Sequence, residues 1–376
     1  MSAKIKGILW EAPPHTLAKI SILQTYLSRW FEILGRSRYR QKLWYIDGFA
    51  GPGEYTNSPK GSPVAAMTSA GEALRNAGAR WKADAIHCVF IEEDEKRFVH
   101  LRGKLEAIAE SKEIHTHFFN STFVDGLAEL KREGCNPFSP PSPLFVFVDP
   151  FGAKGIPFSV IKDLLSRDSC EVLINFDSDG IGRIFRADEA ASHQKILNEI
   201  FGDDSWVNEL AKHRKSHDLY RGVLDLYKQK LLAIPKVRYV FAFEMRSAKN
   251  TIDYHLVFAS QHPLGLEKMK EAMKTIASNG DYCFCDAHIG QTAIFRFDEP
   301  SAHSNQLYAQ FRGKTAKYSE LNDYVLNETP FTNPKSMLKN LEEKDLIQVR
   351  SSDPKRRKGT FNDEKIIDIM FCGGAG

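Results

Sequence analysis

Acidic and amide side chains follow several strand-like apolar runs of the sequence, where they could take part in chemistry. The four residues are Asp47, Glu92, Asn120 and Asp149. In open α/β folds, ligands bind at the carboxyl ends of parallel strands. We therefore expect these side chains to lie around one ligand cleft.

The first of these runs, residues 43–53, reads LWYIDGFAGPG and places glycines at positions 48, 51 and 53 after Asp47. Glycine allows positive φ and lets a ligand approach the backbone closely. The loop is expected to hold a cofactor, although glycine-rich turns also occur without a ligand. Ser62 as a helix cap, followed by proline, predicts that the next helix begins there. Residues 54–61 are then an exposed segment beside the cleft.

Glu92 ends the second apolar run, residues 86–92. A carboxylate at this point can accept paired hydrogen bonds from the two hydroxyls of a ribose. The alternative is a solvated acidic helix start, because three more acidic residues follow. Asn120, at the tip of the third run (114–119), could bond an adenine edge or cap the next helix.

The fourth run, residues 144–149, ends in Asp149 and continues as DPFGAKG. Asp149 supplies a fixed hydrogen-bond acceptor, Pro150 constrains the backbone, and Phe151 can stack on a flat ring. The alternative is a strand that ends in a plain Asp-Pro turn. We expect these three residues to be the catalytic group.

The elements that must position these residues form an α/β pattern. Residues 15–35 have helical apolar spacing. His15 and Lys19 are expected to be a capping-region and a solvated side chain, and the alternative is that they reach a substrate. A fifth strand (171–176) precedes a helical insertion at 177–235, expected to cover the cleft. Two strands, 237–245 and 253–260, then form an antiparallel pair, with further strands at 282–285 and 292–297. Five βα units followed by such a pair is the strand pattern of class I methyltransferases, a Rossmann-like fold with a seven-stranded mixed sheet.

The pattern changes near residue 300, so we expect domains at 1–300 and 301–376. Two helices and a β-hairpin in the second domain indicate a winged helix. Cations on its second helix and hairpin loop could neutralise backbone phosphates, although a winged helix that binds protein can also carry a solvated basic loop. The candidate nucleic-acid contacts are Lys335, Lys339, Lys355, Arg356, Arg357 and Lys358.

The composition of the 376 residues is that of an ordinary globular chain, with 42% hydrophobic and 26% charged residues and a net charge of +3. No apolar stretch has the length of a membrane helix, and the N-terminus lacks the apolar core of a secretory signal, so we expect a cytoplasmic protein. Cys283 and Cys285 are too few for a metal site and are expected to be reduced thiols on a strand. We expect no metal.

Six segments together resemble the bacterial three-Cys-motif partner protein family (TcmP), over about residues 15–300. They are YIDGFAGPG, GSPVAAM, FIEEDEKRF, VDPFGAKG, EVLINF and YHLVFAS. The resemblance implies a class I fold that uses S-adenosylmethionine, often with a C-terminal winged helix, and a partner protein with a cysteine motif. It implies that the methionine part of the cofactor is held by Asp47, Gly48, Phe49, Ala50, Gly51 and Gly53. It further implies that Glu92 takes the ribose and that Asn120 lies near the adenine.

The DPFG segment departs from the Asp-Pro-Pro-Tyr or Asn-Pro-Pro-Tyr motif of amino-directed nucleic-acid methyltransferases, since its aromatic residue is shifted by one position. The expected function is methyl transfer to DNA or RNA. Asp149 would accept a hydrogen bond from the attacking group, and Phe151 would stack on its base. The alternatives are a DNA-binding regulator whose methyltransferase fold is a scaffold or sensor, and a methyltransferase acting on protein or peptide.

Overall fold

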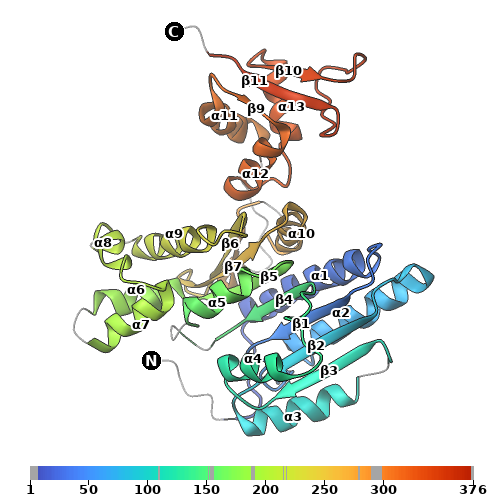
Figure 1. Cartoon of the computed structure of the whole chain (residues 1–376). Helices are drawn as coiled ribbons and strands as arrows, with labels where there is room; N and C mark the ends of the chain where they lie inside the picture. The colour runs from blue at the N-terminus through green and yellow to red at the C-terminus, as the bar shows by residue number, and fades with distance from the viewer. Residues whose placement is uncertain are drawn as a thin grey trace. The chain divides into compact units, whose positions relative to one another are not determined.

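A computed structural model describes residues 7–108, 111–150, 152, 156–187, 191–214, 216, 218–277, 280–288 and 299–373. The chain divides into two compact units (Figure 1). The first comprises Met1–Ile276 and Cys283–Ile289, and the second comprises Ala277–Tyr282 and Gly290–Gly376. No helix among the described residues is long and apolar enough to cross a membrane.

The first unit is built on one eight-stranded sheet with the order β3-β2-β1-β4-β5-β7-β6-β8. β7 is antiparallel to both β5 and β6, whereas the first five strands are parallel to one another. The strands are β1 (Lys42–Asp47), β2 (Ala85–Ile91), β3 (Ile114–Phe119), β4 (Leu144–Val148), β5 (Cys170–Phe176), β6 (Tyr239–Arg246), β7 (Ile252–Ser260) and β8 (Cys283–Cys285).

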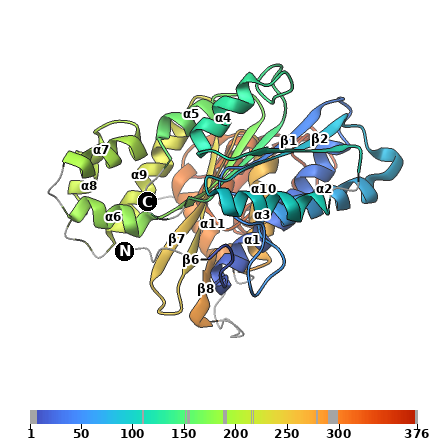
Figure 2. The same cartoon turned by 90° about the horizontal axis from the view of Figure 1, so that it is seen from below.

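Helices cover both faces of this sheet (Figure 2). One face carries α1 (Pro14–Gly35), α2 (Ser62–Ala77), α3 (Glu95–Glu106) and α10 (Pro263–Lys274). The other face carries α4 (Phe123–Arg132), α5 (Phe158–Leu165), α7 (Ala191–Phe201), α8 (Trp206–Ala211) and α9 (Leu219–Leu232). α6 (Ser178–Arg186) follows β5 and packs against β7 and α9.

The central strands are apolar throughout because both of their faces are covered. In β1, Trp44 and Ile46 join the core beneath α4 and α5. Tyr45 points to the other face, where its ring stacks on Phe145, which in turn contacts Tyr26 of α1. This two-sided burial fixes the strand register. Because β1, β2, β4 and β5 are parallel, their carboxyl ends meet at one edge of the sheet.

The class I methyltransferase-like fold is confirmed, with two corrections. The sheet has eight strands rather than seven, because the short β8 adds to β6 in parallel. In its described residues the insertion at 177–235 is helical, as expected, but the apolar sides of α6 to α9 join the core beside β4 and β5 rather than only covering the cleft. The strand expected at 292–297 lies outside the described residues.

The described residues of the second unit form three helices and a three-stranded sheet with the order β10-β11-β9. Its core includes Leu321 and Leu338 from two helices and Ile369 from the sheet. The elements are α11 (Pro300–Phe311), β9 (Thr315–Ala316), α12 (Tyr318–Glu328), α13 (Lys335–Glu343), β10 (Ile347–Ser351) and β11 (Ile366–Phe371).

Candidate active site

A polar cavity of about 400 Å³ opens at the carboxyl edge of the first sheet. Its walls come from the start of α1 and the segment before it, the loop after β1, the ends of β4 and β5, α6 and the start of β7. β7 contributes its beginning because it runs antiparallel to β5. Lining residues include Trp10, Lys19, Phe49, Ala50, Gly51, Gly53, Glu54, Tyr55, Asp149, Pro150, Asn175, Asp177, Arg183, Asp253 and Tyr254.

The glycine loop adopts the backbone conformation that its sequence predicts. Gly51 and Gly53 have φ of 60° and 84°, in the left-handed region that favours glycine. The loop folds back on the start of α2, where the amide of Gly61 donates a 2.7 Å hydrogen bond to the carbonyl of Gly53. Gly61, rather than Ser62, is the N-cap residue of α2.

Glu92, which follows β2, is hydrogen-bonded to this loop and is not a solvated helix start. It is buried, and its Oε2 accepts a 2.8 Å hydrogen bond from the amide of Gly51 while its Oε1 accepts one of 2.9 Å from that of Asp94. Burial raises the pKa of Glu92, and these two backbone hydrogen bonds oppose the rise. Asp94 is the residue that caps α3, by accepting from the amide of Arg97.

Asn120 does not cap the following helix. The side chain of Thr122 is the cap of α4, accepting from the amide of Asp125. Asn120 instead donates its Nδ2 to the backbone carbonyls of Glu92 and Glu93, at 2.8 and 3.2 Å. It therefore ties the end of β3 to the end of β2.

Asp47 is fully buried and lies behind the loop rather than in the cavity lining. Its Oδ2 accepts from the Tyr45 hydroxyl at 3.1 Å, and its Oδ1 accepts from the amide of Phe49 at 3.4 Å. Burial raises the pKa of Asp47 to about 7, against the opposing effect of a hydrogen bond with Ser62. Asp47 thus supports the loop from inside the fold.

Asp149 is held between two side chains. Lys19 of α1 places its Nζ 2.5 Å from Oδ2 of Asp149, and Asn175 at the end of β5 donates its Nδ2 to Oδ1 at 2.6 Å. Lys19 is buried, so the expectation of a solvated lysine is wrong. Its ammonium also lies 5.2 Å from the centre of the Tyr254 ring. Pro150 lines the cavity, and Phe151 lies outside the described residues.

His15 is a second side chain of α1 that lies beside the cleft, as one of the two interpretations of its sequence position expected. Its Nε2 lies 3.1 Å from Asp253, which lines the cavity, and its Nδ1 lies 2.8 Å from Asp286. Burial alone lowers the pKa of His15, but the hydrogen bonds with Asp253 and Asp286 raise it above its usual value. The two carboxylates therefore favour the protonated form of His15, which lies buried between them.

The segment before α1 also forms part of the cavity wall. Trp10 packs edge-on against Tyr55, with ring centres 5.5 Å apart, and its carbonyl accepts from the amide of Thr56 at 3.0 Å. The backbone of Ala12 exchanges two 2.9 Å hydrogen bonds with the side chain of Asn57. The apolar run Ile8–Trp10 ahead of the first helix is the sequence signal that could have indicated this role.

The basic residues of the second unit that we expect to contact nucleic acid differ in their exposure and in whether they pair with a carboxylate. Arg356 donates to both carboxylate oxygens of Glu342, at 2.7 and 2.8 Å, and is half-buried. Lys358 pairs with Asp345 at 2.7 Å. Exposed cations are present at Lys335, Lys339, Lys355, Arg357 and Lys358.

Cys283 and Cys285 lie on β8 as free thiols, with Cys285 buried. Within the ranges that the structure describes, no group of three or more His, Cys, Asp or Glu side chains is arranged to hold a metal ion.

No family model matches the chain, and no curated protein matches it. It is similar to the solved O-methyltransferase from Bacillus cereus in complex with SAH, at 13% identity, 63% coverage of this chain, 79% of that chain and a TM-score of 0.35. It is also similar to the O-methyltransferase TomG from Streptomyces achromogenes in complex with SAM, at 16% identity, 62% coverage of this chain, 79% of that chain and a TM-score of 0.34. For Trm1 from Pyrococcus horikoshii with S-adenosyl-L-methionine, the identity is 11%, the coverage is 72% of this chain and 61% of that chain, and the TM-score is 0.33.

These TM-scores lie below 0.5, so the class of fold rests on the sheet itself. The strands follow the order β3-β2-β1-β4-β5-β7-β6, and β7 runs antiparallel to its two neighbours, β5 and β6. This order and direction are the class I methyltransferase pattern.

Proposed function

We propose that the first unit is a methyltransferase that uses S-adenosylmethionine. The observation that carries this proposal is the hydrogen bond from the amide of Gly51 to Oε2 of Glu92. It joins the glycine loop after β1 to the acid after β2, at the carboxyl edge of a class I sheet. In open α/β folds these two positions hold the two halves of a nucleotide-like cofactor.

The residues present fit this cofactor. Each oxygen of Glu92 accepts one backbone hydrogen bond, which leaves a lone pair on each for the two ribose hydroxyls. The loop of residues 48–53 would hold the methionine part, and Asn120 lies beside Glu92 on the adenine side. When bound, S-adenosylmethionine supplies a methyl group activated by a positively charged sulfur.

The charge of the cavity suits a cationic donor. Its lining includes four carboxylates, from Glu54, Asp149, Asp177 and Asp253, against the cations Lys19 and Arg183. Lys104 and His100 pair with Glu54 at 2.5 and 2.9 Å, outside the cavity lining. Asp149 in turn pairs with Lys19, and Asp253 lies 3.1 Å from His15, so the lining carboxylate that would chiefly favour a positive charge in the cavity is Asp177.

Asp149 would orient the methyl acceptor. Lys19 and Asn175 each donate to one of its oxygens, so the carboxylate is fixed in position and keeps further lone pairs for an acceptor N–H or O–H. Fixing the acceptor in line with the methyl group supplies most of the rate gain in such a reaction. Pro150 restrains the backbone after Asp149, and Phe151 would stack on the acceptor.

We propose nucleic acid as the acceptor because of the second unit. Its helix–strand–helix–helix–strand–strand order supports the proposal of a winged helix, in which α13 would approach the groove. Lys335 and Lys339 are exposed on α13, and Lys339 lies against Gly359 of the basic loop. Lys355 and Arg357 on that loop extend the same set of exposed cations. A partner protein of the kind that the TcmP resemblance implies is a further proposal.

A second candidate function is a DNA-binding regulator in which the first unit only binds the cofactor. The ion pair between Lys19 and Asp149 favours it, because the carboxylate nearest the expected acceptor position already has a cation. This candidate predicts cofactor binding and DNA binding without methyl transfer.

The test is incubation of the full chain with methyl-labelled S-adenosylmethionine and separated DNA, RNA and protein fractions. Label in DNA or RNA is the expected result. Label in protein alone would replace the nucleic-acid acceptor by a protein one, and cofactor binding without label in any fraction would favour the regulator. Glu92→Ala should weaken cofactor binding about 10- to 100-fold, because charged hydrogen bonds contribute about 1.5–3 kcal/mol. Glu93→Ala, at the exposed neighbouring position, is the matched control.

A further inference from the structure

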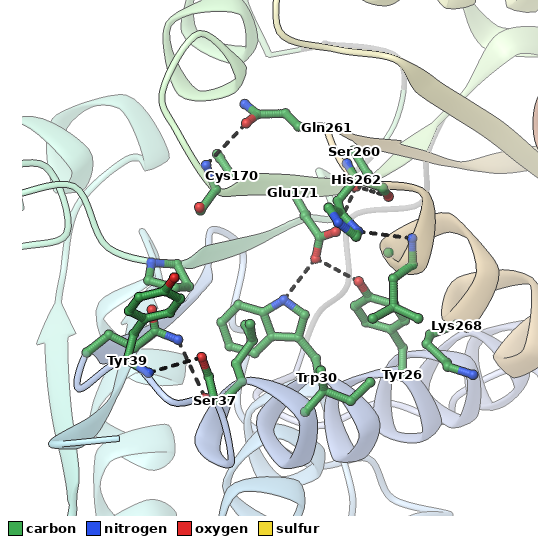
Figure 3. Close-up of a pocket in the computed structure, with 17 residues that line it drawn as sticks. Tyr26, Trp30, Ser37, Tyr39, Cys170, Glu171, Ser260, Gln261, His262 and Lys268 are labelled. Carbon is green, nitrogen blue, oxygen red and sulfur yellow. Dashed lines mark hydrogen bonds between the residues drawn. The ribbon is translucent and has the colours of Figure 1, made fainter. Parts of the chain in front are cut away.

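A second cavity, of about 300 Å³, lies at the opposite edge of the first sheet. Figure 3 shows it between the second half of α1, the start of β5 and the residues that follow β7. Glu171 and Asn175 lie on the same strand, with Asn175 in the active-site cavity and Glu171 in this one. The two cavities are therefore separate spaces at the two ends of β5.

The walls of this second cavity are largely aromatic and aliphatic. They are formed by Tyr26, Trp30, Ile33, Leu34, Tyr39 and Pro143. Ile33 and Tyr39 are exposed, at 37% and 62%, and mark the open side, whereas Tyr26 is 1% exposed and marks the inner end. Cavities of this size with apolar walls and a few polar groups are typical of small-molecule sites.

The inner end carries one buried carboxylate, Glu171, which is 9% exposed. Its Oε2 accepts from the hydroxyl of Tyr26 at 2.7 Å and from Nε1 of Trp30 at 2.8 Å, and its Oε1 accepts from the hydroxyl of Ser260 at 2.8 Å. Figure 3 shows the Tyr26 and Trp30 side chains converging on the carboxylate from α1. These three neutral donors orient the carboxylate, and in the described part of the chain none of its hydrogen-bond partners is a cation.

The unequal use of the two oxygens leaves room at Oε1. Oε1 accepts one hydrogen bond where Oε2 accepts two. Gly265, which also lines the cavity, lies so close that a Cβ there would be 2.0 Å from Oε1 and 2.6 Å from the Ser260 hydroxyl oxygen. A side chain at position 265 would clash with Oε1, so glycine lets α10 pack against the carboxylate, and Oε1 keeps one lone pair for a donor that enters from the cavity.

The basic side chains at the rim have partners of their own. Lys268 pairs with Glu267 and Glu271, at 3.0 and 2.9 Å. His262 accepts the amide of Leu264 at its Nδ1, 3.2 Å away. Neither side chain donates to Glu171, and the contact of His262 with the carboxylate is through its electrostatic field.

Buried carboxylates are stable chiefly when paired with a cation or fully hydrogen-bonded. Aromatic faces such as those of Trp30 and Tyr26 also attract cations. We propose that this cavity binds a small organic cation, an ammonium group on an aromatic or short aliphatic body, with the ammonium donating to Oε1 of Glu171. This site is independent of the methyl-transfer proposal.

The experiment uses 2-phenylethylammonium as the probe, with the full chain and calorimetric titration. Its matched neutral and anionic controls are 2-phenylethanol and 3-phenylpropanoate. We expect the ammonium to bind at least tenfold more tightly than either control, and Glu171→Gln to remove that preference. Equal binding of the three probes, or tighter binding of the anion, would overturn the proposal.

A second pair of variants keeps the test valid if Glu171→Gln fails to fold. Ile33→Arg places a cation at the exposed mouth, and Ile33→Gln is its neutral match. We expect Ile33→Arg to weaken ammonium binding at least fivefold relative to Ile33→Gln. Saturating S-adenosylhomocysteine distinguishes the two cavities, because displacement of the probe by it would place the ammonium in the active-site cavity and overturn the proposal.

Discussion

Lys19 and Asp149 are 130 residues apart in the chain, yet Nζ of one lies 2.5 Å from Oδ2 of the other. Their side chains are 6% and 20% exposed, so the pair is largely withdrawn from water. The pair joins α1 to the end of β4, at the cavity in which we propose methyl transfer. Asp149 is therefore a fixed, charge-compensated acceptor rather than a free base.

Loss of the Asp149 charge should affect transfer more than cofactor binding. We expect Asp149→Asn to lower kcat at least 100-fold while the Kd for S-adenosylmethionine stays within about threefold, because oriented hydrogen bonds act on the reacting groups. Labelled methyl transfer and calorimetry measure the two quantities. Asp163→Asn, on the exposed surface of α5, is the control, and unchanged kcat in Asp149→Asn would remove Asp149 from the mechanism.

The same pair should be visible in stability. Lys19→Met leaves a partly buried carboxylate without its cation, and we expect a loss of about 2–3 kcal/mol in the free energy of unfolding, somewhat less than for a fully buried pair. The double variant Lys19→Met/Asp149→Asn should recover at least 1 kcal/mol of that loss. Urea denaturation of the four proteins gives the coupling energy. Strict additivity of the two single changes would show that the ion pair does not stabilise the fold.

Asp47 predicts a specific pH dependence of stability. Burial raises its pKa in the folded protein to about 7, from the usual 3.8. Between about pH 4 and pH 7 the folded state therefore binds a proton that the unfolded state does not. This difference destabilises the fold as pH rises through that window, by up to about 1.4 kcal/mol per pH unit.

The comparison of wild type with Asp47→Asn isolates this effect, because the amide oxygen can still accept from the Phe49 amide while the amide NH2 can donate to the Tyr45 hydroxyl oxygen. We expect the variant to gain stability relative to wild type as pH rises from 4 to 7, with no further gain above about pH 8. Urea midpoints at each pH provide the measurement. A difference that does not vary with pH would mean that Asp47 is ionised throughout this range.

The basic loop of the second unit should bind nucleic acid through some of its cations only. We expect Lys355→Gln and Arg357→Gln each to weaken DNA binding and to reduce the salt slope of log K by about 1, as for one lost phosphate contact. Fluorescence anisotropy at several salt concentrations measures both. An unchanged slope in both variants would contradict a phosphate-binding role of the loop.

Arg356 should behave differently from its neighbours because it holds Glu342 by two hydrogen bonds. Burial alone raises the pKa of Glu342, but the hydrogen bonds from Arg356 and Gly359 lower it overall. We therefore expect Arg356→Gln to lower the stability of the second unit by about 2–3 kcal/mol. Thermal unfolding followed by circular dichroism tests this, and a purely electrostatic loss of DNA affinity at unchanged stability would contradict it.

The sequence by itself determined the βα pattern, the glycine loop and the acids that end the first, second and fourth strands. These are local signals, since apolar runs, glycine and helix caps act through neighbouring residues. Glycine at positions 51 and 53 predicts the left-handed turns that the structure contains. The antiparallel pair after the insertion could be predicted for the same reason, because two neighbouring apolar runs joined by a short polar segment are a local signal.

Only the tertiary structure decided which side chains meet. Lys19 and His15 lie on an amphipathic helix whose sequence does not distinguish a solvated cation from a buried one, and their partners Asp149 and Asp253 are far along the chain. Trp10 lies in the cavity wall through a hydrogen bond with Thr56 and a ring contact with Tyr55. Glu171 becomes the floor of a second cavity through contacts with α1 and β7. Such contacts depend on sheet order and helix packing, which bring distant residues together and leave no periodic trace in the sequence.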